Sequence, residues 1–413
     1  MGNMACCEST KNANQANQNN QNNQNNPRVN KHIDTISPAN PKLNSTNPAT
    51  KPKTNQGTGI NEEASLPENQ RRASIGSSVK MSSNSGGRIS PASSVKKNYS
   101  NLPKDKINPF KMEKSFLAHK KIIVCMIELE NKLIATGSYD NTIKVWDIKN
   151  QNCQNEIKEE GKVFALLEFE PNLILSAIDK TPDDIQEISQ IRGEDIVINL
   201  WDLNSPNTDN KVIYSFIGHQ LRINCLVKCN DKFFASCSND GEIIIWDYHL
   251  RRKVNNLIGH GDCILCLIRL NNGRLCSGSA DMTIKIWNWE EGSCIATLSE
   301  NKHWVKCLCQ LSNGYILSGS HDNLIKIWDE NNQYLTELDG HTESVRSICQ
   351  IGKSNYIASA SFDHTIKIWD LNTMQCVQTL SEHQSSVINV IYHSDEYLIS
   401  CSNDKTIKIW KSY

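Results

Sequence analysis

Histidine, serine and aspartate side chains recur along the C-terminal part of this chain at spacings that could assemble a hydrolytic triad. One set consists of His219, Ser238 and Asp240, with Trp246 six residues after the aspartate. A serine becomes nucleophilic when a histidine takes its proton and an aspartate orients that histidine. This set has counterparts in most of seven successive units, however, and seven copies of one active site in a single chain are implausible. The repetition argues against catalysis and favours a structural role for these side chains.

A second pattern that could do chemistry is the pair Cys263 and Cys266, which has the C-x-x-C spacing of zinc ligands. On a strand, the odd separation places the two thiols on opposite faces, and the sequence offers no second ligand pair. It also contains no glycine-rich signature of nucleotide binding. We therefore expect neither a metal nor a cofactor. The chain shows no secretory signal, so its 16 cysteines are expected to be reduced thiols in the cytosol.

Internal repetition organises this part of the chain. Seven tryptophans are separated by 55, 45, 41, 41, 41 and 41 residues, each with an isoleucine three residues and an aspartate six residues before it. They are Trp146, Trp201, Trp246, Trp287, Trp328, Trp369 and Trp410. Apolar and polar residues alternate before each tryptophan, which predicts a β-strand entered through a tight turn at the aspartate. Each unit is too small to bury its own apolar faces, so the units must stack and close.

These units resemble the WD-repeat family of β-propellers. The likeness extends over about residues 113–413 and includes three Gly-His pairs and five Trp-Asp pairs. It implies an all-β, seven-bladed β-propeller in which a structural hydrogen-bond network recurs in each blade. The network residues implied by the likeness include His219, Asp240, Trp246, His260, Asp281, Trp287, His341, Asp363 and Trp369. Blades 2 and 5 carry Glu159 and Asn301 in place of the histidine, so we expect them to be less well tied. Residues 113–117 are expected to complete the last blade.

In this family, partners usually bind the face where the histidine-bearing loops and the aspartate turns emerge. Positions are counted from the histidine of each unit, or from the residue that replaces it. If positions four and six face the core, then positions three and five face the channel and the partner-binding surface. With residues just before the aspartate turns added, the predicted partner-binding face contains Ile122, Val124, Tyr139, Phe164, Arg222, Leu265, Trp304, Lys306, His321, Arg346, Phe362 and Ile388. Aromatic residues and arginine dominate interface hot spots, which favours a protein partner. The alternative is that these rim side chains pack on one another.

Blade 2 is longer than most of the others. Its tryptophan follows the preceding one by 55 rather than 41 residues, an excess of 14. We place this excess between Asp179 and Gly193, a segment rich in carboxylates. Two interpretations remain open: an acidic flap that contacts a partner, or a surface loop that the fold tolerates.

Charge divides the chain in two. Residues 1–110 hold 14 Lys and Arg against 6 Asp and Glu, a net charge of +8, whereas residues 111–413 hold 30 against 39, a net charge of −9. Residues 12–26 are almost entirely Asn and Gln, and Ser, Pro and Gly continue toward residue 109. Such a composition buries too little apolar surface to offset its ordering entropy, so we expect residues 1–110 to form a long disordered N-terminal tail. The acidic domain of residues 111–413 disfavours a nucleic-acid partner.

The first residues of the tail resemble an acylation signal. Removal of Met1 would expose the amine of Gly2 for N-myristoylation, and Cys6 and Cys7 are candidates for palmitoylation. The usual motif has Ser or Thr at the position of Cys6. One acyl chain anchors a protein only marginally, whereas two hold it at a membrane. No apolar run approaches the roughly 18 residues that a membrane helix needs.

A basic stretch follows closer to the domain. Residues 71–106 contain eight Lys and Arg and a single acid. Beside an anionic leaflet, each such charge adds attraction of about 1 kcal/mol; the alternative is a solvated linker. Within the stretch, the sequence Arg-Arg-Ala-Ser ending at Ser74 resembles the recognition motif of basophilic kinases, and a phosphate there would weaken the attraction. Ser37 and Ser90 precede prolines and are candidates for proline-directed kinases.

These features predict a non-enzymatic protein-interaction scaffold, cytoplasmic and peripheral, tethered by its acylated tail to the cytosolic face of a membrane. The expected partners are one or more proteins on the propeller face, the membrane and a basophilic kinase. Two alternatives are a substrate-recognition subunit of a ubiquitin ligase and a G-protein β-like signalling subunit. The tail contains neither an F-box-like helical segment nor an amphipathic N-terminal helix, which disfavours both alternatives.

Overall fold

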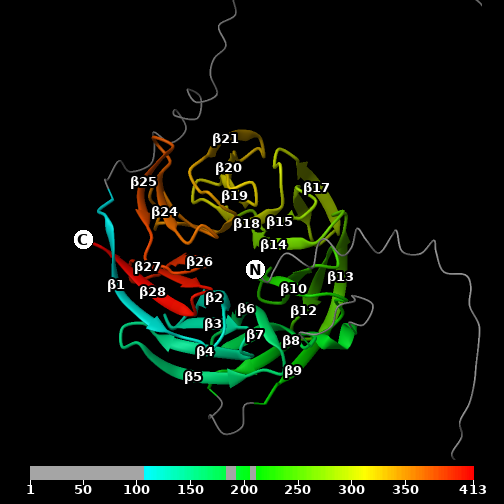
Figure 1. The fold of residues 1–413 in the computed structure, drawn as a ribbon. Helices are drawn as coiled ribbons and strands as arrows, with labels where there is room; N and C mark the ends of the chain where they lie inside the picture. Colours follow the sequence, from blue (N-terminus) through cyan, green and yellow to red (C-terminus); the bar gives the residue numbers. More distant parts are fainter. Residues whose placement is uncertain (1–106, 183–191, 205–210) are drawn as a thin grey trace, which may run out of the picture. The chain divides into compact units, whose positions relative to one another are not determined.

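The computed structural model describes residues 107–182, 192–204 and 211–413, and these residues form seven four-stranded antiparallel sheets. Figure 1 shows the sheets as blades around a central channel, with one innermost strand of each blade beside the channel. The predicted all-β, seven-bladed propeller is therefore confirmed. The positions Gly2, Cys6, Cys7, Ser37, Ser74 and Ser90, and residues 183–191 of the blade 2 insertion, lie outside the described residues. Nowhere in the described ranges does a helix reach the length and apolarity needed to cross a bilayer.

The blades are numbered in chain order, and their strands are given from the innermost to the outermost. Blade 1 consists of β2 (Ile123–Glu128), β3 (Ile134–Ser138), β4 (Thr142–Asp147) and β5 (Asn152–Lys158). Blade 2 consists of β6 (Lys162–Glu170), β7 (Leu173–Asp179), β8 (Ile196–Asp202) and β9 (Tyr214–Ile217), with the short 3₁₀ turn η3 (Gly193–Asp195) before β8. Blade 3 consists of β10 (Ile223–Lys228), β11 (Phe233–Ser238), β12 (Glu242–Asp247) and β13 (Arg252–Ile258).

The remaining blades follow the same order. Blade 4 consists of β14 (Ile264–Arg269), β15 (Leu275–Ser279), β16 (Ile284–Asn288) and β17 (Ser293–Leu298). Blade 5 consists of β18 (Val305–Gln310), β19 (Ile316–Ser320), β20 (Ile325–Trp328) and β21 (Tyr334–Leu338). Blade 6 consists of β22 (Val345–Gln350), β23 (Tyr356–Ser361), β24 (Ile366–Asp370) and β25 (Gln375–Leu380). Blade 7 consists of β26 (Val387–Tyr392), β27 (Tyr397–Ser402), β28 (Thr406–Ser412) and, at the rim, β1 (Phe110–Leu117).

Adjacent blades share their apolar cores. Between blades 5 and 6, for example, Leu317, Ile325 and Ile327 belong to the same buried cluster as Val345 and Trp369. The tryptophans of blades 4 to 7 are at most 1% exposed. The propeller is therefore held together by stacking of units that cannot bury their apolar faces alone.

Every innermost strand contains a β-bulge at the same place. In blade 6 the register of β22 against β23 shifts between Val345 and Ser347, so Arg346 is left without a ladder partner. The same shift occurs in β2, β6, β10, β14, β18 and β26. The strict alternation assumed from the sequence is therefore wrong here. In blade 1, Ile123 at position four faces the core shared with blade 7, whereas Cys125 at position six packs against the core shared with blade 2. The bulge changes the direction of the side chain at position five.

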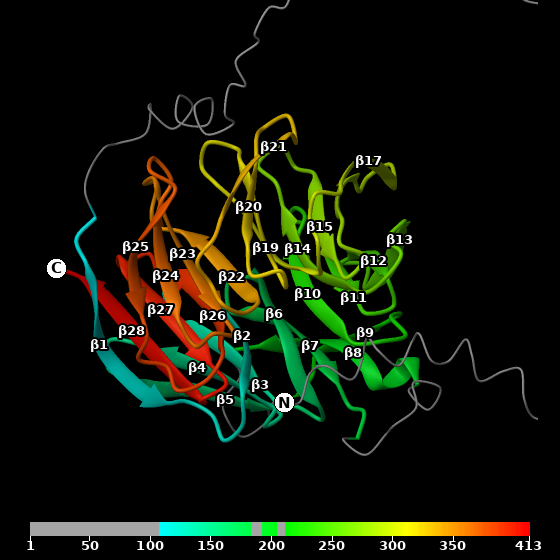
Figure 2. The same cartoon turned by 45° about the horizontal axis from the view of Figure 1, so that its top comes forward.

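The ring is closed by a strand from the beginning of the domain. β1 pairs antiparallel with β28 along its whole length, which confirms the predicted closure; the strand begins at Phe110, three residues before the predicted 113. Figure 2 shows β1 beside β28 at the edge of blade 7. Phe110 is buried in the core between blades 6 and 7, and its backbone N–H and carbonyl bond to the Gln378 side chain at 2.9 and 2.6 Å. β1 therefore joins the last blade to its neighbour as well as completing it.

A relay of buried hydrogen bonds ties the parts of each blade together. In blade 3, Trp246 Nε1 donates to Ser236 Oγ at 2.8 Å, Ser236 Oγ lies 2.7 Å from His219 Nε2, and His219 Nδ1 lies 2.8 Å from Asp240 Oδ2. The serine of the relay is Ser236 rather than the predicted Ser238, whose hydroxyl accepts the backbone N–H of Asp240 at 3.1 Å. The relay therefore links two strands to the loop before β10 and the turn before β12.

The relay recurs in blades 1, 4, 6 and 7, and blade 1 has Thr136 in place of the serine. The distance from histidine Nδ1 to aspartate Oδ2 is 2.7 Å in blades 4, 6 and 7 and 3.1 Å in blade 1. The members in blades 4, 6 and 7 are His260, Ser277, Asp281 and Trp287; His341, Ser359, Asp363 and Trp369; and His383, Ser400, Asp404 and Trp410. Burial alone would raise the pKa of these aspartates, but hydrogen bonds from the histidine and the turn lower it below the usual value. The turns are therefore held by charged carboxylates.

Blade 2 keeps the relay with a glutamate in place of the histidine. Glu159 accepts hydrogen bonds from Trp201 Nε1 at 2.6 Å, from Asn199 Nδ2 at 2.8 Å and from the hydroxyl of Ser176. Burial raises the pKa of the Glu159 carboxyl, and these three hydrogen bonds oppose that shift. Glu159 therefore joins the two central strands of blade 2, but its carboxylate replaces only part of the relay, because the turn residue Asp195 accepts the N–H of Arg192 at 3.2 Å instead.

Blade 5 holds its turn with an ion pair. Asn301 Oδ1 lies 3.4 Å from Ser318 Oγ, a long contact, and its Nδ2 has no hydrogen-bond partner among the described residues. The turn residue Asp322 instead binds Lys326 Nζ at 2.8 Å, and Lys326 is only 1% exposed. Burial opposes this pairing, but the ammonium group still lowers the pKa of Asp322. Asn301 thus binds its neighbours weakly, as we predicted for blade 5. The buried Lys326 supplies the positive charge that faces Asp322.

We expect removal of residues 1–117 to destabilise the whole ring, because it exposes the edge of β28 and empties the Phe110 site. Truncating a buried phenylalanine costs about 3–5 kcal/mol, and an unpaired strand edge recruits other chains. The melting temperature should fall by about 10 °C or more, and sedimentation should show oligomers. Removal of residues 1–106 alone is the matched control and should change neither; equal melting of the two truncations would contradict the closure role.

We expect Glu159→Ala to lower the free energy of unfolding by about 3 kcal/mol, because it leaves three buried donors without an acceptor. Urea denaturation measures this change. Glu160→Ala is the control, since the neighbouring carboxylate makes an exposed ion pair with Lys180 and should contribute less than about 1 kcal/mol. Equal losses from the two variants would show that Glu159 does not tie blade 2.

Candidate partner-binding face at the channel mouth

The bulged innermost strands and the turns beside them bring aromatic and cationic side chains to one end of the channel. We name this group the channel-mouth cluster, and it consists of Tyr139, Lys162, Phe164, Arg222, Trp304, Lys306, His321, Arg346 and Phe362. The predicted face residues Ile122, Val124 and Leu265 are half-buried on the innermost strands of blades 1 and 4 or directly before them. The residues predicted for this face come from all seven blades, and eight of the twelve belong to the channel-mouth cluster.

Blades 1 to 3 contribute one chain of ring contacts. The rings of Tyr139 and Phe164 lie 5.2 Å apart, and the Arg222 guanidinium lies 4.7 Å from the centre of the Phe164 ring. Lys162 Nζ lies 5.7 Å from the Tyr139 ring. Cations placed over aromatic rings in this way are attracted by the ring quadrupole. Phe164 is only 8% exposed, so it supports its neighbours and offers little surface to a partner.

Blades 5 and 6 contribute a second group. Trp304 stacks on His321 with ring centres 5.4 Å apart, and Lys306 Nζ lies 4.5 Å from the Trp304 ring. His303, which sequence reasoning missed, lies 4.4 Å from His321. Burial lowers the pKa of His321, and the charges of His303, Lys306 and Arg346 lower it further. His321 is therefore neutral at pH 7 and presents a flat ring beside Trp304.

Arg346 connects the two groups across the channel. Its guanidinium lies 5.3 Å from the Phe362 ring, and its Nε is buried with no hydrogen-bond partner among the described residues. Burial lowers the pKa of Arg346, and the positive charge of Arg222 on blade 3 acts in the same direction. The Arg346 guanidinium therefore lies over an aromatic ring in a poorly solvated position.

Part of the predicted face is core instead. Ile388 is 8% exposed and belongs to the apolar cluster between blades 7 and 1, with Phe362 packed against the same cluster. The alternative interpretation, that rim side chains pack on one another, therefore describes Ile388 and Phe164. A bulge residue can turn into the core when it is aliphatic, whereas the charged Arg346 and Lys306 at the same position stay half-buried.

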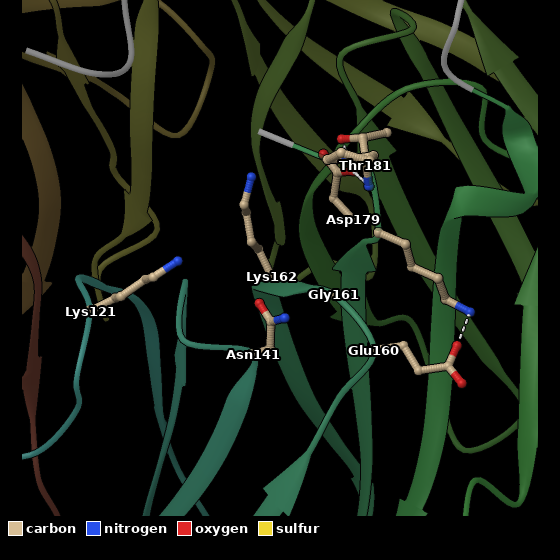
Figure 3. Close-up of a pocket in the computed structure, with 9 residues that line it drawn as sticks. Lys121, Asn141, Glu160, Gly161, Lys162, Asp179 and Thr181 are labelled. Carbon is tan, nitrogen blue, oxygen red and sulfur yellow. Dashed lines mark hydrogen bonds and ion pairs between the residues drawn. The ribbon is translucent and has the colours of Figure 1, made fainter. Parts of the chain in front are cut away.

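A hollow beside the channel adds more lysines. It is lined by Lys121 and Asn141 from blade 1 and by Glu160, Gly161, Lys162, Asp179, Lys180, Thr181 and Pro182 from blade 2. Figure 3 shows the side chains of Lys121 and Lys162 on one side of Gly161 and that of Glu160 on the other. Lys180 Nζ pairs with Glu160 at 2.5 Å. The start of the blade 2 insertion forms one wall of this hollow. Lys121 was also missed by sequence reasoning, because it lies two residues after His119 and the prediction used only positions three and five.

The buried cysteines are packing residues. Burial raises the pKa of Cys125 and of Cys307 to about 12, so both thiols are neutral and weakly nucleophilic. Within the described ranges, no group of three His, Cys, Asp or Glu side chains is placed to hold a metal ion.

Comparison with known proteins gives a family and a fold. A family model described as "WD domain, G-beta repeat" matches residues 110–147, 210–247, 251–288, 292–329, 332–370 and 374–411. These matches leave out most of blade 2, the blade that is longer than most others and carries Glu159 instead of histidine. The crystal structure of the WD40 β-propeller domain of Doa1 has the same fold, with a TM-score of 0.63, 22% identity, and coverage of 74% of this chain and 98% of that chain.

Curated relatives are similar over shorter stretches. The methylosome protein WDR77 of Xenopus laevis is 27% identical over 121 residues, which are 29% of this chain and 32% of the relative. The ribosome biogenesis protein YTM1 of Debaryomyces hansenii is 31% identical over 130 residues, 29% of this chain and 25% of the relative. This chain thus spans about a third or less of the relatives it matches. Six matched repeats and seven observed blades establish that the chain belongs to the WD40 repeat family.

Proposed function

We propose that this protein is a non-catalytic scaffold that binds a protein partner at the channel-mouth cluster. The observation that carries the proposal is that half-buried aromatic side chains, Trp304 and Phe362, lie against the cations Lys306 and Arg346 at the bulges of blades 5 and 6. Such aromatic and arginine side chains supply most of the binding energy in protein interfaces. The histidine and aspartate groups that could suggest catalysis are used inside the relays.

Membership of the WD40 family supports this role, since propellers of this family generally bind proteins. Two relatives are named for the methylosome and for ribosome biogenesis. We infer from these names that this chain also works within an assembly. The rigid ring suits that role, because its binding side chains are positioned before a partner arrives and lose little entropy on binding.

We further propose that the tail tethers the propeller to the cytosolic face of a membrane through acyl groups on Gly2 and on Cys6 or Cys7. Two acyl chains make such an anchor stable, and the basic residues between 71 and 106 add attraction to anionic lipids. A phosphate on Ser74 would reduce that attraction and release a protein held by one chain only. A tethered scaffold concentrates its partner near the membrane.

Replacing Trp304 and Arg346 together by alanine should abolish partner capture while the propeller stays folded, because both residues are half-buried at the mouth and outside the relays. Proximity labelling in cells should lose a discrete set of neighbours. The control is Tyr334→Ala with Arg252→Ala, which removes the same types of side chain from exposed outer strands. An unchanged set of neighbours in the mouth variant would refute the proposed face.

Gly2→Ala should release the protein from membranes into the supernatant of a cell fractionation, because alanine at that position is not myristoylated. Asn3→Ala is the matched control and should keep the protein in the membrane pellet. If Gly2→Ala stays in the pellet, or if the labelled neighbours are ligase subunits, the tether is wrong and the ubiquitin-ligase alternative gains support.

A further inference from the structure

The innermost strands carry cations where they face the channel, although the domain as a whole is acidic. The fourteen positions three and five after the relay residue include four basic residues and no acidic one, although residues 111–413 carry a net charge of −9. The four are Lys162, Arg222, Lys306 and Arg346. If the Asp and Glu residues of this acidic domain were distributed at random, some of them would occupy these positions as well. The cations are therefore concentrated where the blades converge.

Two of these cations are equivalent in the fold. Lys306 and Arg346 are the bulge residues of the neighbouring blades 5 and 6, and they lie over the rings of Trp304 and Phe362. Both side chains are half-buried, so water screens their like charges poorly. An anion beside Lys306 and Arg346 would offset these charges and accept charge-assisted hydrogen bonds.

The mouth holds buried polar atoms that lack partners among the described residues. They are Arg346 Nε, Ser344 Oγ, His321 Nδ1 and Asn403 Oδ1. Ser386 connects Phe362, whose ring contacts Arg346, with Asn403. The Ser386 hydroxyl donates a hydrogen bond to the carbonyl of Phe362, and the Ser386 carbonyl accepts one from the backbone N–H of Asn403. Buried polar groups are normally hydrogen-bonded, so a group of unpaired ones at a surface opening points to a ligand or to ordered water.

The unpaired atoms are of two kinds. Arg346 Nε–H can only donate, and the hydroxyl of Ser344 donates readily, so both suit an anionic oxygen. Asn403 Oδ1 can only accept, so it suits an N–H group of the same ligand. A simple anion satisfies the donors but not the acceptor, whereas a peptide brings an anionic side chain and backbone N–H groups together. The rings of Trp304 and Phe362 offer apolar walls for the rest of such a segment.

We infer that the channel mouth binds an acidic peptide segment, whose carboxylate or phosphate group lies beside Lys306 and Arg346 and whose backbone N–H reaches Asn403. This inference rests on the proposed function, because it names the kind of partner that the proposed face would take. Glutamate and phosphoserine share the chemistry that these residues recognise, and the experiment separates them.

The test uses the full-length protein and arrays of short peptides that are identical except at fixed positions, which carry glutamate, phosphoserine, glutamine or lysine. Hits are re-measured by fluorescence anisotropy at low and high ionic strength. We expect the glutamate or the phosphoserine series to bind at least about tenfold more tightly than the glutamine series, and this preference should weaken as salt rises. Which acidic series binds better identifies the anion. Equal binding of the glutamine series, or tighter binding of a single-stranded oligonucleotide, would overturn the inference.

Variants locate the site. Arg346→Met and Lys306→Met should each weaken acidic-peptide binding about tenfold or more, and Asn403→Leu should weaken it without changing the salt dependence. Arg252→Met is the matched control, since this arginine is exposed on the outer strand β13 and should leave binding unchanged. Melting temperatures check that each variant is folded. If the mouth variants lose neighbours in cells while no acidic peptide binds, the proposed function stands and this inference fails; if both readouts are unaffected, both fail.

Discussion

The buried hydrogen-bond relay is the constraint on which the rest of this structure depends. An indole N–H, a hydroxyl, an imidazole and a carboxylate meet between two strands, a loop and a turn, and each needs a partner because little water reaches them. The relay therefore joins the loop and the turn to the two central strands of the blade. Blade 2 meets the same requirement with Glu159, and blade 5 meets part of it with Lys326 against Asp322. The chemistry of the relay tolerates substitution as long as the polar groups remain paired.

The binding face depends on a second repeated feature, the β-bulge of the innermost strands. The bulge falls at the same place in every innermost strand, including that of blade 5, where the relay is incomplete. Its residue is half-buried in blades 5 and 6 and belongs to the core in blade 7. Positions that are equivalent in the fold can then differ in chemistry: Arg346 and Lys306 are charged, while Val124 and Ile388 are aliphatic. The backbone geometry is the same from blade to blade, and the residue at the bulge gives each blade its own binding chemistry. This separation explains how an acidic ring presents a cationic opening.

Most of the architecture could be predicted from the sequence. The spacing of the tryptophans indicated seven units, and the missing fourth strand of the last unit indicated that the segment before the first unit closes the ring. Both predictions depend on periodicity, which survives substitution. The relay serine was harder, because Ser236 and Ser238 both lie on β11 and only the distance to His219 distinguishes them. The role of Glu159 was hidden for a similar reason, since three hydrogen bonds to one carboxylate follow from geometry and not from residue type.

The candidate site could be predicted only in part. Period-two alternation placed Arg222, Trp304 and Arg346 at the mouth, and they are there, but it did not anticipate the bulge that separates positions four and six onto opposite faces. It also counted Phe164 and Ile388 as surface, although neighbouring rings and an aliphatic core cover them. His303 and Lys121 lie two residues after the relay positions of Asn301 and His119, and the prediction used only positions three and five.

Hydrogen–deuterium exchange of the full-length protein with and without a captured partner tests the central claim most directly. The account predicts that added protection falls on residues 303–306, 344–346 and 361–363, which carry the mouth side chains of blades 5 and 6. The outer strands β5, β13, β17 and β25 should exchange at the same rate in both samples. Protection confined to those outer strands, with the mouth segments unchanged, would contradict the account and move the binding surface to the rim of the propeller.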